Sequence, residues 1–171
     1  MIELLILYVL TKKELTMYAI LKAIMDNFAT YTQPSFGAIK PALTRLEKEG
    51  FIHSRKAMSE GGKLSGFYSI TEEGKKELKH LLLEKLSANP LQFNSASKIK
   101  LSCASYLAQD ERSAMFSQIK TKALEHQYTA KNTLENESNS LSFYQKILLD
   151  NSICEYKNFI SIIEGLEKEN S

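Results

Sequence analysis

A run of polar side chains between residues 35 and 48 has the types and the spacing that binding to a nucleic acid requires. Lys40 and Thr44 lie one helical turn apart, and side chains of these types hydrogen-bond the edges of bases. Arg45 and Lys48 lie further along the same side and can reach bases or phosphate oxygens, and Ser35 can bind a phosphate at the helix start. The alternative is an ordinary solvated helix face.

The helix that must carry these residues is predicted to begin after Ser35, a candidate N-cap, and to stop at Gly50, a typical residue just beyond a helix end. Its inward face would consist of Ile39, Leu43 and Leu46. Pro41 removes one helical hydrogen bond, so a kink or a tight first turn is expected.

The elements before and after this helix follow from the same periodicities. An apolar segment, Ile2 to Leu10, predicts a central helix, because a helix that is apolar all round belongs between others. The further predictions are a second helix capped by Thr16 and ending near Asn27, two antiparallel strands at 51–56 and 66–70 joined by a glycine-containing tip, and a helix capped by Thr71.

Three helices, a hairpin and another helix make the order of a winged helix-turn-helix domain. The segment from Pro34 to Ile52 closely resembles the recognition-helix signature of the PadR family of bacterial transcription regulators. Tyr68 to Gly74 and the Tyr18-Ala19-Ile20 step also resemble that family, and the helical second half looks like the C-terminal domain of its virulence-activator-like branch. The resemblance implies a sequence-specific DNA-binding regulator, acting as a homodimer on a palindromic operator in double-stranded DNA and more often a repressor.

By the same resemblance, Lys63 and Ser65 at the tip of the wing would contact the minor groove or the DNA backbone. The chain departs from the family where Lys40 replaces the usual Tyr, where Thr16-Met17 replaces His-Gly, and where the wing lacks a run of arginines. The operator sequence therefore cannot be carried over from the family.

The second half predicts two long antiparallel helices, one from a cap at Asp110 to a break at 136–140 and one from Leu141 onward. The fold class is therefore mainly α with a small β-hairpin: a DNA-binding domain at 1–86, a linker at 87–94 and a helical dimerisation domain at 95–171. The alternative is an intramolecular bundle without a partner. The residues expected at the dimer seam are Ile147, Ile153, Tyr156, Ile160 and Ile163.

Aromatic residues of the second half are candidates for an effector pocket, because some members of the family respond to phenolic or drug-like compounds. The alternative is that they only pack the core, and His126 on an apolar stripe is expected to be a core or interface residue. The candidate pocket residues are Tyr106, Phe116, Tyr128 and Tyr144.

Composition excludes several other classes of protein. The net charge is only +2, so DNA binding must come from local clustering of cations. Two cysteines, Cys103 and Cys154, are expected to be reduced packing residues. Neither they nor the three scattered histidines have the spacing of a metal site. No catalytic or cofactor motif occurs, so neither an enzyme nor a cofactor is expected. The apolar run Leu4 to Leu10 is too short to span a membrane, and it lacks the cationic start and the small-residue cleavage site of a signal peptide, which favours the cytoplasm. A winged-helix module that binds protein rather than DNA remains the alternative function.

Overall fold

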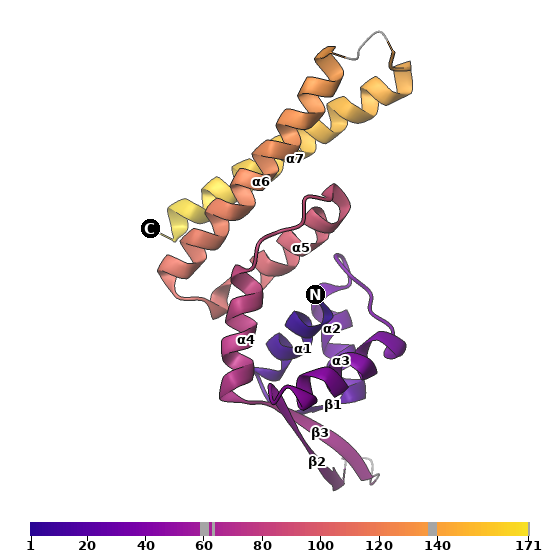
Figure 1. Cartoon of the computed structure of the whole chain (residues 1–171), viewed down its shortest axis with the longest axis vertical. Helices are drawn as coiled ribbons and strands as arrows, with labels where there is room; N and C mark the ends of the chain where they lie inside the picture. The colour runs from indigo at the N-terminus through magenta and orange to yellow at the C-terminus, as the bar shows by residue number, and fades with distance from the viewer. Residues whose placement is uncertain (59–61, 63, 137–139, 171) are drawn as a thin grey trace. The chain divides into compact units, whose positions relative to one another are not determined.

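The computed structural model describes residues 1–58, 62, 64–136 and 140–170. Contacts within the chain divide it into two compact units, the first Met1–Glu84 with Lys98–Tyr106 and the second Lys85–Ser97 with Leu107–Ser171 (Figure 1). Helix α5 (Pro90–Ser102) begins inside the segment 87–94 that the sequence predicts as a linker, and its residues are divided between the two units. The functional division into domains 1–86 and 95–171 stays a prediction.

Helix α1 (Ile2–Leu10) forms the centre of the first unit. Leu5, Ile6 and Leu7 on successive sides of this helix are all fully buried. Helices α2 (Met17–Phe28), α3 (Phe36–Lys48) and α4 (Glu72–Leu83) all contact α1 (Figure 1). The predicted central helix is confirmed.

The first turns of α2 and α3 are built differently. The Thr16 hydroxyl oxygen accepts a hydrogen bond from the Ala19 amide at 3.2 Å, so Thr16 caps α2 as expected. Ser35 occupies the N-cap position of α3, but its side chain makes no capping hydrogen bond. The Ser35 carbonyl instead accepts hydrogen bonds from the amides of Ala38 and Ile39, at 3.0 and 3.2 Å, which gives the tight first turn expected of a helix containing Pro41.

The wing belongs to a three-stranded antiparallel sheet with the strand order β1-β3-β2. Strands β2 (Ile52–Met58) and β3 (Leu64–Ile70) form the predicted hairpin, in which Ser54 pairs with Tyr68. Strand β1 (Leu15–Thr16) is too short for its alternation to show in the sequence, and it pairs with β3 on the other side. Gly50, with φ +77°, makes the turn from α3 into β2.

Helix α4 starts at its predicted cap and passes very close to the backbone that precedes β2. The Thr71 hydroxyl oxygen accepts a hydrogen bond from the Gly74 amide at 2.9 Å. A Cβ atom at Gly74 would lie 2.0 Å from the Phe51 carbonyl oxygen, so only glycine permits this approach. The sequence signature around Gly74 therefore has a packing reason.

Helix α5 and the short 3₁₀ helix η1 (Ala104–Tyr106) were not predicted. The C-terminal part of α5 brings Lys100, 4% exposed, to the end of α4. There the Lys100 ammonium donates a hydrogen bond to the Glu84 carbonyl oxygen, and burial lowers the pKa of Lys100. A cation at this position satisfies a carbonyl group that the helix end leaves open and complements the helix dipole.

The second unit is dominated by two long antiparallel helices, α6 (Gln109–Asn136) and α7 (Phe143–Glu169) (Figure 1). Ser142 caps α7 in a capping box: its hydroxyl oxygen accepts a hydrogen bond from the Gln145 amide, and the Gln145 side chain accepts one from the Ser142 amide. The sequence analysis missed this cap. Asp110 lies in the first turn of α6 and is not its cap, because the Ala108 amide at the helix start donates instead to Glu111. The mainly helical fold class with a small antiparallel sheet is confirmed.

Candidate nucleic-acid interface

The polar face predicted for the third helix is exposed in the structure. Lys40, Thr44 and Lys48 recur every four residues along α3, and all three are exposed. Ile39, Leu43 and Leu46 on the opposite side are buried against the first unit, as predicted. We call the three exposed residues the polar stripe. Helices of the first unit therefore leave the polar stripe open to a ligand.

The hydroxyl groups on this helix differ in what they can still bind. The Thr44 hydroxyl donates to the Lys40 carbonyl oxygen at 3.2 Å, which occupies its proton and leaves its oxygen able to accept. Thr44 in this rotamer can accept a hydrogen bond from an exocyclic amino group of a base. Ser35 is exposed at the start of α3.

Arg45 is also exposed, but its guanidinium group is held by a carboxylate of another helix. Its Nε and Nη2 atoms donate to one oxygen of Glu3 in α1, at 2.9 and 2.6 Å. The pair is half exposed to solvent, so a phosphate can compete for the guanidinium. Sequence reasoning missed this pairing because 42 residues separate the partners.

Two aromatic side chains next to the polar stripe were also missed. Phe36, the first residue of α3, stacks on Tyr18 near the start of α2 with 6.2 Å between ring centroids and 26° between ring planes. The Phe36 side chain stands four residues before Lys40, and that spacing was the signal that could have found it.

On the wing, Lys63 lies outside the described residues, and Ser65 is half-buried on β3. The structure adds two exposed cations on β2, Arg55 and Lys56. The Arg55 guanidinium forms a two-pronged ion pair with Glu14 and lies 5.4 Å from the centre of the Phe67 ring. Hydrogen bonding to Arg55 lowers the pKa of the Glu14 carboxyl. The pair braces the wing against the residue that precedes β1.

The residues expected at a dimer seam divide into two groups. Tyr156, Ile160 and Ile163 are buried within the second unit, and Ile153 is half-buried. Ile147 is 49% exposed. Other exposed apolar side chains of the second unit are Phe143, Tyr144 and Leu148 on α7 and Tyr128 on α6.

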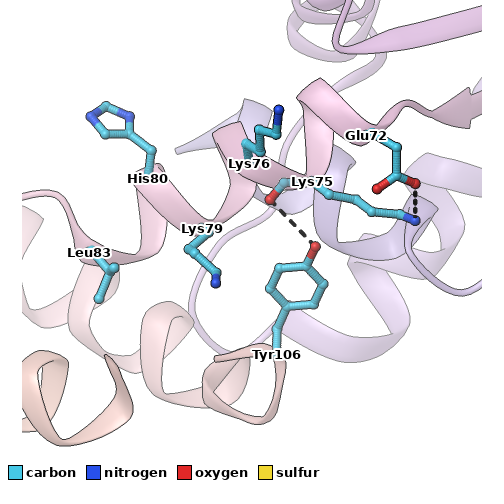
Figure 2. A pocket seen from close by; sticks show the side chains of 7 residues that line it. All are labelled: Glu72, Lys75, Lys76, Lys79, His80, Leu83 and Tyr106. Carbon is cyan, nitrogen blue, oxygen red and sulfur yellow. Dashed lines mark hydrogen bonds and ion pairs between the residues drawn. The ribbon is translucent and has the colours of Figure 1, made fainter. Parts of the chain in front are cut away.

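The four aromatic residues expected to line an effector pocket belong to different units and differ in their exposure. Phe116 is buried in the second unit, whereas Tyr128 and Tyr144 are 70% and 76% exposed. Tyr106 belongs to the first unit, where its ring lies beside α4 and its hydroxyl donates to the Lys75 carbonyl oxygen at 3.4 Å (Figure 2). A pocket of about 490 Å³ there is lined by Tyr106, Leu83, Glu72, Lys75, Lys76, Lys79 and His80.

Across the part of the chain that the structure describes, no cluster of three or more His, Cys, Asp or Glu residues could hold a metal ion. Burial raises the pKa of Cys103 to about 12, so its thiol stays protonated. Cys154 is exposed, so the expectation that both cysteines pack the interior is wrong for Cys154.

Among the described helices, none combines the length and the apolar character needed to cross a membrane.

A three-helix core, an antiparallel wing and an open polar stripe on the third helix define a winged-helix protein of the DNA-binding class. A family model described as the transcriptional regulator PadR-like family matches residues 6–80. A PadR family transcription regulator from hypervirulent Clostridium difficile R20291 is 31% identical over 46% of this chain and 80% of its own, with a TM-score of 0.42. This chain belongs to the PadR-like family, whose members are transcriptional regulators and not enzymes.

Longer similarities extend over nearly the whole chain. Bacillus subtilis PadR in complex with operator DNA is 23% identical, with 99% of this chain and 97% of that chain covered and a TM-score of 0.48. The same protein in complex with p-coumaric acid is 23% identical over 98% and 97% of the two chains, with a TM-score of 0.43. No curated protein matches the sequence.

Proposed function

We propose that this transcriptional regulator is a sequence-specific repressor that binds a palindromic operator as a homodimer in the cytoplasm. The observation that carries the proposal is the exposed polar stripe of Lys40, Thr44 and Lys48 on α3, next to the buried face that fixes its direction. Lys40 and Thr44 would contact base edges, while Lys48, Arg45 and Ser35 would contact phosphates. Lys63 and Ser65 of the wing would contact the minor groove or the DNA backbone.

The homodimer is supported by the exposed apolar side chains of the second unit. Ile147, Tyr144 and Leu148 lie within five residues of one another on α7, and each is about half exposed or more. Contiguous apolar surface of this kind is typical of interaction sites. A second copy of the chain would cover it and would hold two recognition helices about 34 Å apart, one turn of the duplex.

An effector is supported by the pocket beside Tyr106 (Figure 2). Its aromatic ring and the side chain of Leu83 offer apolar walls, while Lys75 and Lys79 bring positive charge. A small aromatic carboxylate, the chemical class of the p-coumaric acid bound by Bacillus subtilis PadR, has matching parts. Lys75 is paired with Glu72 at 2.6 Å, so the carboxylate would have to displace that pair.

The effector proposal is tested by titrating p-coumarate into the wild-type protein and into Tyr106→Ala, with Tyr128→Ala as the control. Tyr106→Ala should lose binding, and Tyr128→Ala should retain it because Tyr128 is an exposed residue of the other unit. If Tyr128→Ala lost p-coumarate binding and Tyr106→Ala retained it, the effector site would lie in the second unit.

Repression at an operator is tested first by titrating the protein against the DNA upstream of its own coding region, with unrelated DNA as competitor at two salt concentrations. Sub-micromolar binding of a dimer that survives the competitor is the expected result. Lys40→Ala and Thr44→Ala should each relax the preference at one position of the half-site, costing about 1–3 kcal/mol for a good base contact.

A winged-helix module that binds protein is the second candidate function. Its support is the same exposed apolar surface on α6 and α7, which a different protein could cover. Random-sequence selection distinguishes the DNA-binding function from the protein-binding function. If the wild-type protein enriches no DNA sequence, and the Lys40→Ala variant still binds every protein that the wild type binds, the domain is a protein-interaction module.

A further inference from the structure

The first unit carries an exposed aromatic pair beside the polar stripe, and packing within the unit does not explain its exposure. Tyr18 is 66% exposed and Phe36 is 43% exposed, although both are large and Phe36 is wholly apolar. Their rings stack on one another, but that contact leaves the greater part of the Tyr18 side chain in water. A stacked pair that only joined α2 to α3 would gain more by being buried.

The position of the pair ties it to the polar stripe. Phe36, Lys40, Thr44 and Lys48 follow at intervals of four residues, so Phe36 extends the stripe at the N-terminal end of α3. In helix-turn-helix proteins it is the N-terminal residues of the recognition helix that contact base edges. In the proposed binding mode, the aromatic pair therefore lies at the end of α3 whose side chains would contact base edges.

Only one apolar group is presented in the major groove by the four bases, the 5-methyl group of thymine. We propose that Phe36, backed by Tyr18, selects thymine at one position of each half-site by burying this methyl group. The inference rests on the proposed DNA-binding function and adds a specificity-determining contact to it. Lys40 and Thr44 would read polar edges, and the aromatic pair would read the neighbouring methyl group.

The test removes the methyl group and nothing else. An operator is first obtained by random-sequence selection, and each thymine of the half-site is then replaced by deoxyuridine in both half-sites together. At one position the wild-type protein should bind about fifteenfold more weakly, which corresponds to about fourfold for each buried methyl group. Phe36→Ala should bind the thymine and deoxyuridine operators equally.

Two further variants separate methyl recognition from a general effect on folding. Phe36→Leu keeps an apolar side chain and should retain part of the discrimination, with a circular dichroism spectrum like that of the wild type. Tyr31→Ala removes another exposed aromatic side chain of the first unit that does not belong to α3 and should retain the full discrimination.

Several outcomes would overturn the inference while leaving the proposed function standing. They are a selected operator without a preferred thymine, wild-type binding that is insensitive to deoxyuridine at every position, and Phe36→Ala retaining the wild-type discrimination. A protein that selects no DNA sequence at all would instead overturn both proposals.

Discussion

At the scale of single residues, Lys48 stands apart from the other cations of α3. It lies in the last turn of the helix and is exposed, whereas Arg45 is already paired with Glu3. Its distance from the helix N-terminus favours contact with a phosphate, which carries no sequence information.

Lys48→Ala should therefore weaken binding to all DNA and flatten the dependence of log K on log salt by about 0.9 for each phosphate contact, or about 1.8 for a dimer. Titrations at several salt concentrations measure the slope. Lys157→Ala, at an exposed lysine of α7, is the control and should leave the slope unchanged. An unaltered slope in Lys48→Ala would remove this residue from the phosphate contacts.

His126 makes the stability of the second unit depend on pH. Its ring contacts those of Phe93 and Tyr156, with centroid distances of 4.9 and 5.5 Å, and its buried Nε2 atom has no hydrogen-bond partner among the described residues. Burial lowers the pKa of His126, and the nearby Lys122 lowers it further, whereas Glu125 acts in the opposite direction. The folded state therefore prefers the neutral ring.

The free energy of unfolding should be highest above the unfolded-state pKa of His126, about 6.5, and should fall as pH drops through the window below it, because the unfolded chain then binds the extra proton. Urea denaturation at pH 5 and pH 7.5 measures this. His126→Phe should reduce the difference between the two pH values, and His53→Gln, at an exposed histidine, should not. Identical pH dependence in wild type and His126→Phe would contradict the assignment.

At the scale of elements, the junction of α4 with the wing depends on Gly74. A side chain at this position has no room, since the Phe51 carbonyl oxygen is backbone and cannot move aside as a side chain would. Gly74→Ala should lower the free energy of unfolding by about 1–3 kcal/mol or more. Gly165→Ala in α7, where nothing lies within 4 Å of the added carbon, should raise it by about 0.5–1 kcal/mol. Chemical denaturation of both variants tests the pair, and equal effects would refute the close approach of α4.

At the scale of the whole molecule, the two groups of seam candidates should respond differently to charge. Ile147→Glu places a carboxylate on the exposed apolar surface of α7 and should dissociate the proposed dimer while the helical spectrum is kept. Ile160→Glu places one at a site only 8% exposed and should lower the melting temperature of the second unit instead. Light scattering and circular dichroism together distinguish these results. Retention of the dimeric mass in Ile147→Glu would exclude this surface as the seam.

Local signals were enough to predict much of the first unit. The caps Thr16 and Thr71, the buried positions of α3 and the hairpin depend on residues close together in the chain, and each of these predictions was confirmed. Helix α5 was missed because its apolar residues show no helical period and its surroundings come from two units. The site residues themselves remain predictions, although the structure leaves the polar stripe exposed as expected.

Sequence patterns alone predicted the three helices, the hairpin and the fourth helix of the first unit, the polar side of the third helix and the family signature, because helix period, capping and turn chemistry act over a few residues. Only the three-dimensional structure shows that Glu3 pairs with Arg45, that Tyr18 stacks on Phe36, and which side of α7 is buried. A long helix with apolar residues on several sides does not specify from its pattern which side its neighbour covers. That choice depends on packing between α6 and α7, which buries Ile163 and leaves Ile147 open.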